Sequence, residues 1–157
     1  MFFKESGEKE AKISEADQAV ACFKQGINCS QALLSTYGKH YGLDPELALR
    51  VSGAFGSGMG MGETCGAVTG ALMVIGLKHS KAAGSRLFSK DKTGDVAYEF
   101  MERFKARHGT MVCKELLGCD VSTPEGLKTA KQKKHFKKRC PEYVQDAALI
   151  LEELLKD

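Results

Sequence analysis

The sequence predicts an all-α protein, a single domain over residues 1–157 built as a bundle of roughly six or seven helices around a central buried helix. Three observations predict this class. Apolar residues recur at helical spacing along most of the chain, and no segment keeps the apolar–polar alternation of a strand. The stretch Cys65–Leu77 is apolar on all sides, which is typical of a helix buried by its neighbours. With 43% hydrophobic residues, the chain can bury such a core.

Capping signals define the first three helices. Residues 1–12 are polar after the third position, and we expect them to form a loose tail. Beyond this tail, each helix follows a residue whose side-chain oxygen can accept backbone N–H groups of the first turn, namely Ser14, Asn28 and Asp44. Proline directly after Asp44 suits the first helical position. The expected helices run from Ser14 to about Gly26, from Cys29 to Tyr41, and from Pro45 to about Ser52.

A glycine-rich loop leads into the central helix, which is expected over about 65–78 after the candidate cap Thr64. Glycine stands at positions 53, 56, 58, 60 and 62, and this density allows left-handed backbone and the close approach of other groups. The loop matches neither a dinucleotide nor a phosphate-binding fingerprint. We expect its backbone to close over a cofactor or a thiol pair, with Gly60, Gly62, Gly66 and Gly70 as candidate cofactor-binding residues. Tight helix packing is the alternative explanation.

The second half of the chain is predicted to hold a loop and the remaining helical segments. Residues 79–92 are small and polar and predict the loop. Apolar residues at helical spacing and a closing glycine indicate a helix over 93–108. The segments that follow are a short turn over 111–117, a basic helix from Thr123 to about Phe136, and a C-terminal helix that starts at Cys140 with Pro141 in its first turn.

Six cysteines are spread over the chain, and four of them lie at or within one turn of a predicted helix start. These four are Cys29, Cys65, Cys113 and Cys140, whereas Cys22 and Cys119 lack the feature. Free backbone N–H groups and the positive end of the helix dipole favour a thiolate at such a position. If the four helix starts converge, the sulfurs form one site; four unrelated buried cysteines are the alternative.

Four convergent thiolates allow two kinds of redox chemistry. They can bind an iron–sulfur cluster or another soft metal for electron transfer, since cysteine thiolates are the usual ligands of such clusters. Alternatively, two of them can cycle between dithiol and disulfide, with Cys65 as the expected low-pKa attacker. The candidate catalytic residues and the candidate metal ligands are therefore the same four, Cys29, Cys65, Cys113 and Cys140. Either chemistry implies a redox partner, whether the protein is an oxidoreductase or only carries electrons.

Several short motifs, taken together, resemble one known family. They are Asn28–Ala32, Gly60–Gly62 followed by CGAVTG at Cys65–Gly70, Arg103-Phe104, Cys113–Gly118 and Arg139-Cys140. In order and spacing, over about residues 15–155, they resemble the C_GCAxxG_C_C family of redox-active proteins, named for its cysteine pattern. The resemblance implies that Cys29, Cys65, Cys113 and Cys140 are the characteristic cysteines. A similar domain occurs in multihaem proteins of the split-Soret type, for which an iron–sulfur centre has been suggested. This chain has no CxxCH motif, so covalent haem is not expected.

Charge limits the partners that can be expected. The net charge is +3, and seven cations lie within residues 128–139 with no acid among them. This basic stretch can be a solvated helix face or a surface on which an acidic electron-transfer protein docks. Its only aromatic residue is Phe136, so nucleic acid is not an expected partner. A non-catalytic interaction module that uses this helix is the third hypothesis for function.

Hydropathy predicts a cytoplasmic protein without a membrane partner. The longest apolar run, Cys65–Leu77, has 13 residues, whereas a membrane span needs about 20. The polar start of the chain does not resemble a signal peptide. In the reducing cytoplasm, dispersed cysteines more often bind metals or catalyse reactions than form structural disulfides. The oligomeric state is left open by these observations.

Overall fold

The computed structural model describes residues 13–81 and 92–156, and it confirms the predicted all-α class. The expected tail, 1–12, and most of the expected loop, 79–92, lie outside the described residues. Within the described ranges, the only pairing of extended backbone is an isolated antiparallel bridge between Thr64 and Val112. No helix in those ranges combines the length and the apolar character that crossing a membrane requires.

The first three helices begin where their capping residues predict. Ser14, Asn28 and Asp44 each accept a backbone N–H of the first turn, at 3.1, 2.9 and 3.0 Å. The helices are α1 (Glu15–Lys24), α2 (Cys29–Gly38), α3 (Pro45–Val51) and α4 (Gly66–His79). Helix α2 is shorter than predicted because Lys39–Tyr41 tightens into a 3₁₀ turn, after which Gly42 reverses the chain with φ of 82°.

The second half contains a basic segment that is broken where a continuous helix was predicted. The helices are α5 (Lys92–His108), α6 (Cys113–Leu117), α7 (Pro124–Gln132), α8 (His135–Lys138) and α9 (Cys140–Leu154). The prediction of one basic helix from Thr123 to Phe136 is wrong. Lys134 has φ of 57°, in the left-handed region, and this conformation ends α7 and starts the short α8.

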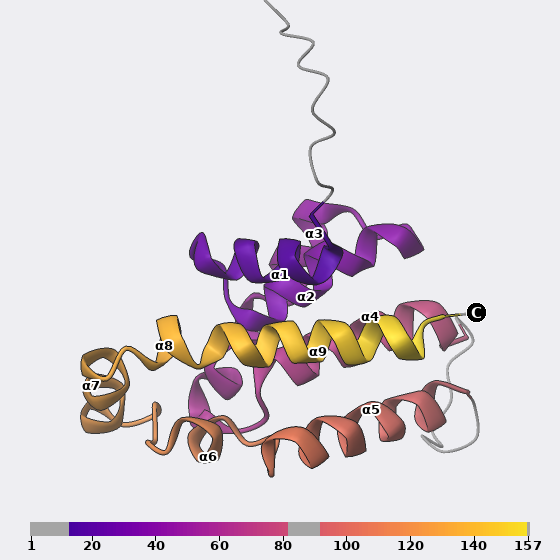
Figure 1. Cartoon of the computed structure of the whole chain (residues 1–157). Coiled ribbons are helices and arrows are strands. Elements are labelled where there is room, and N and C mark those ends of the chain that lie inside the picture. The colour runs from indigo at the N-terminus through magenta and orange to yellow at the C-terminus, as the bar shows by residue number, and fades with distance from the viewer. Residues whose placement is uncertain (1–12, 82–91, 157) are drawn as a thin grey trace, which may run out of the picture.

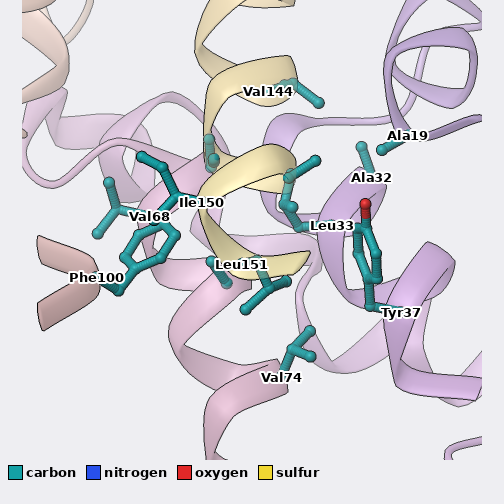
Figure 2. Close-up of a cluster of buried hydrophobic side chains, with 14 of the residues drawn as sticks. Ala19, Ala32, Leu33, Tyr37, Val68, Val74, Phe100, Val144, Ile150 and Leu151 are labelled. Atoms are coloured by element: carbon teal, nitrogen blue, oxygen red, sulfur yellow. The ribbon is translucent and has the colours of Figure 1, made fainter. Parts of the chain in front are cut away.

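Helix α4 is the centre of the fold, as predicted. It packs against α2, α5 and α9, and Figure 1 shows α9 between the group α1–α3 and helix α5. The side chains of Val68, Val74 and Ile75 on α4 are fully buried. Figure 2 shows Val68 and Val74 in one cluster with Phe100 of α5 and Leu151 of α9. Burial by helices on several sides explains why the α4 sequence is apolar all round.

A second, smaller core lies at the start of α9, where α6, α7 and α8 gather in Figure 1. Its buried members are Cys113, Leu117, Val121 and Ala130. Cys119, Phe136, Cys140 and Tyr143 are partly buried against them. Cys29 and Cys65, by contrast, belong to the main core around α4. The predicted site cysteines are therefore divided between two cores.

Helices α2 and α4 cross so closely that two glycines of α4 face the backbone of α2. A Cβ at Gly70 would lie 2.7 Å from the carbonyl oxygen of Ser30 and 3.0 Å from Leu33 Cβ. A Cβ at Gly66 would overlap the Cys29 sulfur and lie 3.0 Å from the Ser30 nitrogen. The close approach expected at Gly66 and Gly70 is therefore the approach of α2, and it places Cys29 against the start of α4.

A methyl group added at Gly70 should force the two helices apart. Gly70→Ala is expected to lower the free energy of unfolding by about 1–3 kcal/mol, the usual cost of overpacking a core, because the nearest atom belongs to the α2 backbone. Gly76→Ala in the same helix is the matched control. Its nearest neighbour would be Ser80 Oγ at 3.8 Å, so it should gain up to about 1 kcal/mol from helix propensity. Urea unfolding followed by circular dichroism measures both, and equal stability would contradict the close crossing.

Candidate functional site

The starts of α2, α4, α6 and α9 meet at one small cavity of about 50 Å³. Each start contributes one cysteine to the lining: Cys29, Cys65, Cys113 and Cys140. Cys22 and Cys119 are not part of this lining. The four sulfurs predicted to share a site thus border a common space between the two cores, while their chemical role stays a prediction.

A capping box fixes Cys29 at the first position of α2. Asn28 Oδ1 accepts the Gln31 N–H at 2.9 Å, and Gln31 Oε1 accepts the Asn28 N–H at 2.9 Å. The same side chains also donate outward, from Gln31 Nε2 to Leu49 O at 2.9 Å and from Asn28 Nδ2 to Gly53 O at 3.1 Å. The start of α2 is thereby attached to α3 and to the beginning of the glycine-rich loop, and this holds Cys29 in place.

Cys65 and Cys113 are held together by the bridge that precedes their helices. The Cys65 N–H donates to Met111 O at 2.8 Å, and the Cys113 N–H donates to Glu63 O at 2.5 Å. Cys65 stands at the N-cap of α4, the position expected for Thr64, and its own N–H is already satisfied. In this antiparallel pairing, the side chains of Cys65 and Cys113 project from the same face of the paired backbone, and both line the cavity.

The start of α9, which carries Cys140, is attached to the end of α6. The carbonyl oxygen of Leu116 accepts hydrogen bonds from the Arg139 guanidinium at 3.1 Å and from the Tyr143 hydroxyl at 3.0 Å. A carbonyl in the last turn of a helix has no partner within that helix, so these donors satisfy a group that burial would otherwise penalise. Cys140 lies between the two donors in sequence and is thereby held at the cavity that Cys113 lines.

The glycine-rich loop reaches the cavity through its backbone. Ser57 adopts φ of 53°, a left-handed conformation that is uncommon for a residue with a side chain, and its N–H donates to the Cys29 sulfur. Of the four glycines predicted to bind a cofactor, Gly66 lines the cavity. The others lie outside it: Gly60 is exposed, Gly62 is buried beside α6, and Gly70 packs on α2.

Three aromatic side chains complete the walls of the cavity. They are Phe23 of α1, Phe136 of α8 and Tyr143 of α9. Helical spacing predicts Phe23 and Tyr143 as core residues, but it does not indicate that they lie beside the cysteines. The signal that could have placed Tyr143 at the site is its position three residues after Cys140, because residues spaced by three on a helix share a face.

The Cys29 sulfur is stabilised as a thiolate. A hydrogen bond from the Cys65 thiol makes the largest contribution, and the backbone N–H groups of Ser57, Ser30 and Cys29 itself add to it. Together these donors outweigh the opposing effect of burial and lower the pKa of Cys29 to about 7. The Cys29 thiol is therefore more acidic than an ordinary cysteine.

The other three cysteines of the cavity remain protonated at neutral pH. The pKa of Cys65 is raised well above its ordinary value because its thiol donates to Cys29, and burial adds to the rise. Burial raises the pKa of Cys113 and that of Cys140 to about 12, with repulsion from Cys29 as the next cause. The cavity thus combines one cysteine of lowered pKa with three whose pKa is raised.

The prediction that Cys65 has the low pKa is wrong, because the low pKa belongs to Cys29. The two sulfurs share a proton, and the backbone decides which of them carries the charge. Three N–H groups donate to Cys29, whereas that of Ala67 alone donates to Cys65. The left-handed Ser57 supplies one of the three donors to Cys29, and the sequence carries no signal for its conformation.

The arrangement of the side chains does not fit a metal ion as it stands. Within residues 13–81 and 92–156, no group of three or more His, Cys, Asp or Glu side chains is placed to hold one. Thiolate ligands approach zinc to about 2.3 Å, so a shared metal needs sulfurs that surround a single point. The four cysteines that line the cavity supply soft donor atoms. They are not arranged around a single point, as a shared metal would require.

The fold and the cavity define a small helical protein with four cysteines at neighbouring helix starts, one of which has a lowered pKa. Comparison with protein families is more specific: residues 27–154 match the family described as "Putative redox-active protein (C_GCAxxG_C_C)". Because the match spans most of the chain, the protein belongs to this family, as the resemblance of its motifs predicts. Neither the curated proteins nor the solved structures contain a match to the chain.

Alkylation of Cys29 should titrate near neutral pH. The thiolate is the nucleophile, so its reaction with iodoacetamide should accelerate as the pH rises through about 7, while Cys113 and Cys140 react only at much higher pH. Cys65→Ala removes the hydrogen-bond donor and should move the Cys29 midpoint to higher pH. Cys22→Ala is the matched control outside the cavity and should leave the midpoint unchanged. Peptide mass spectrometry gives the rates, and a midpoint insensitive to Cys65→Ala would contradict the hydrogen-bonded pair.

Proposed function

We propose that this chain is a thiol–disulfide redox protein in which Cys29 and Cys65 cycle between dithiol and disulfide. The observation that carries the proposal is the position of the Cys29 sulfur against Gly66, the residue directly after Cys65, in a cavity that both cysteines line and where the two thiols interact. The description of the family as redox-active agrees with this class of function. A reducing compartment such as the cytoplasm would return the pair to the dithiol form.

Cys29 would be the attacking residue and Cys65 the resolving residue. The Cys29 thiolate attacks one sulfur of a substrate disulfide, the substrate S–S bond breaks, and a mixed disulfide forms as the first substrate thiol leaves. Cys65 then gives up its proton and attacks the Cys29 sulfur, which releases the second substrate thiol. An attacking thiol works best when its pKa lies near the ambient pH, and the pKa of Cys29, about 7, meets this condition.

Cys113 and Cys140 would extend the site as a second pair of thiols. Both line the same cavity, and burial keeps both protonated at neutral pH. Once the Cys29–Cys65 disulfide has formed, exchange with Cys113 would move it within the cavity without a further reactant. This second pair would therefore store the oxidised state away from Cys29.

Binding of an iron–sulfur cluster or another soft metal is the second candidate function. The observation that favours it is the common cavity of four cysteines at four helix starts, where backbone N–H groups can donate to sulfur. Cys29, Cys65, Cys113 and Cys140 would be the candidate ligands, and a cluster would supply electron transfer when bound. The exposed cations of residues 128–139 would then favour an acidic electron-transfer protein as the partner. The four sulfurs would have to move closer to one another before they could bind a cluster or a metal ion.

Single serine variants separate the two functions. If Cys29 and Cys65 are the working pair, changing either to Ser should abolish disulfide exchange, because each supplies a sulfur that forms the bond. Cys113→Ser and Cys140→Ser should retain most of the activity. The measurements are iron and acid-labile sulfide on protein purified without oxygen, then disulfide mapping after mild oxidation. Bound iron and sulfide, lost alike in all four variants, would replace the dithiol proposal with the cluster.

A further inference from the structure

An open groove of about 500 Å³ adjoins the cysteine cavity, between the end of α1 and helix α8. Its described lining consists of Phe23, Lys24, Gly26, Ile27, Phe136 and Lys137. Two of these residues, Phe23 and Phe136, also line the cavity that contains Cys29. The groove and the cavity are therefore neighbouring spaces with two aromatic side chains between them.

The groove combines apolar walls with unpaired positive charge. Lys24 and Lys137 are exposed, and neither forms an ion pair with another described residue. More exposed cations lie close by in sequence, at Lys133, Lys134 and Lys138. The described lining includes no acidic residue. A ligand that complements this surface carries negative charge and has a less polar part.

We propose that this groove binds a small anionic disulfide, a carboxylate-bearing molecule of low molecular weight, and presents its S–S bond to Cys29. The inference rests on the proposed thiol–disulfide function and names the oxidant of the Cys29–Cys65 pair. In the complex, Lys24 and Lys137 hold the carboxylates. Phe23 and Phe136 contact the sulfur-bearing middle of the molecule at the entrance to the cavity.

The dimensions of the two spaces favour a small molecule over a folded protein as the oxidant. Small-molecule sites commonly enclose about 300–1,000 Å³, and the groove, at about 500 Å³, lies within this range. The cavity behind Phe23 and Phe136 is only about 50 Å³, room for a few water molecules. A narrow sulfur-bearing segment can extend into such a space, whereas a folded surface would have to displace both aromatic rings.

The reaction balances without a further reactant. The Cys29 thiolate attacks one sulfur of the bound disulfide, whose S–S bond breaks; one half leaves as a thiolate, and the other stays on Cys29 as a mixed disulfide. The Cys65 thiol gives its proton to the departing thiolate. The Cys65 sulfur then displaces the second half from Cys29. The small disulfide is reduced to a thiol and a thiolate, and the protein dithiol is oxidised to the Cys29–Cys65 disulfide.

The test compares three disulfides of different charge on the reduced, full-length protein. The probes are glutathione disulfide, which is anionic, hydroxyethyl disulfide, which is neutral, and cystamine, which is cationic. Formation of the Cys29–Cys65 disulfide is followed by acid quench and mass spectrometry, and each rate is divided by that of dithiothreitol with the same probe. At low ionic strength the normalised rate with glutathione disulfide should exceed that with cystamine roughly 10-fold. Added salt should reduce this preference because it screens the lysines.

Two matched double variants locate the charge effect. Lys24→Gln combined with Lys137→Gln should remove most of the preference for the anionic probe, so that the three normalised rates approach one another. Lys128→Gln combined with Lys131→Gln removes the same charge from exposed positions of α7 outside the groove. This control should keep the preference.

Each failure has a distinct meaning. Equal normalised rates on the unaltered protein, or a preference that survives loss of Lys24 and Lys137, would overturn the groove proposal and leave the thiol–disulfide function standing. Failure to form the Cys29–Cys65 disulfide with all three probes and with the general thiol oxidant diamide would overturn the proposed function itself.

Discussion

The close crossing of α2 and α4 is the constraint on which the site depends. Because Gly66 and Gly70 have no side chains, the backbone of α2 at Ser30 lies against α4, and a side chain at Gly66 would occupy the place of the Cys29 sulfur. The same contact sets Cys29 beside Cys65. From the sequence, tight helix packing and closure over a thiol pair are alternative explanations for the glycines. At this crossing, the same close packing of α2 on α4 also brings the two thiols together.

Two identical side chains become chemically different because their backbones differ. The Cys29 sulfur receives N–H groups from its own helix start and from the left-handed Ser57, and the Cys65 sulfur has fewer such donors. A left-handed residue with a side chain costs about 1–2 kcal/mol. The surrounding structure compensates for this cost, and strained backbone of this kind is often found at functional sites. The exposed loop residue therefore helps to determine which buried sulfur is charged.

Local signals predict the helix starts well because capping acts over a few residues. Asn28 with Gln31 three positions later predicts the start of α2, and the capping box is present. Where the backbone leaves its usual conformation without glycine, local signals fail: Lys134 breaks the basic helix, and Ser57 adds a backbone donor to the Cys29 sulfur. The gathering of four cysteines could be proposed from their helix starts, but their order of reactivity could not.

The position of the cavity between two cores distinguishes a disulfide from a metal site. Cys29 and Cys65 belong to the main core, whereas Cys113 and Cys140 belong to the smaller one. A disulfide between the first two joins helices that already touch, so it can form and break without moving the smaller core. A metal held by all four cysteines would span both cores, so its binding would bear on the packing of the smaller one. Dithiol cycling is therefore compatible with a rigid fold, whereas metal binding here would couple occupancy to the packing of α6, α7 and α8.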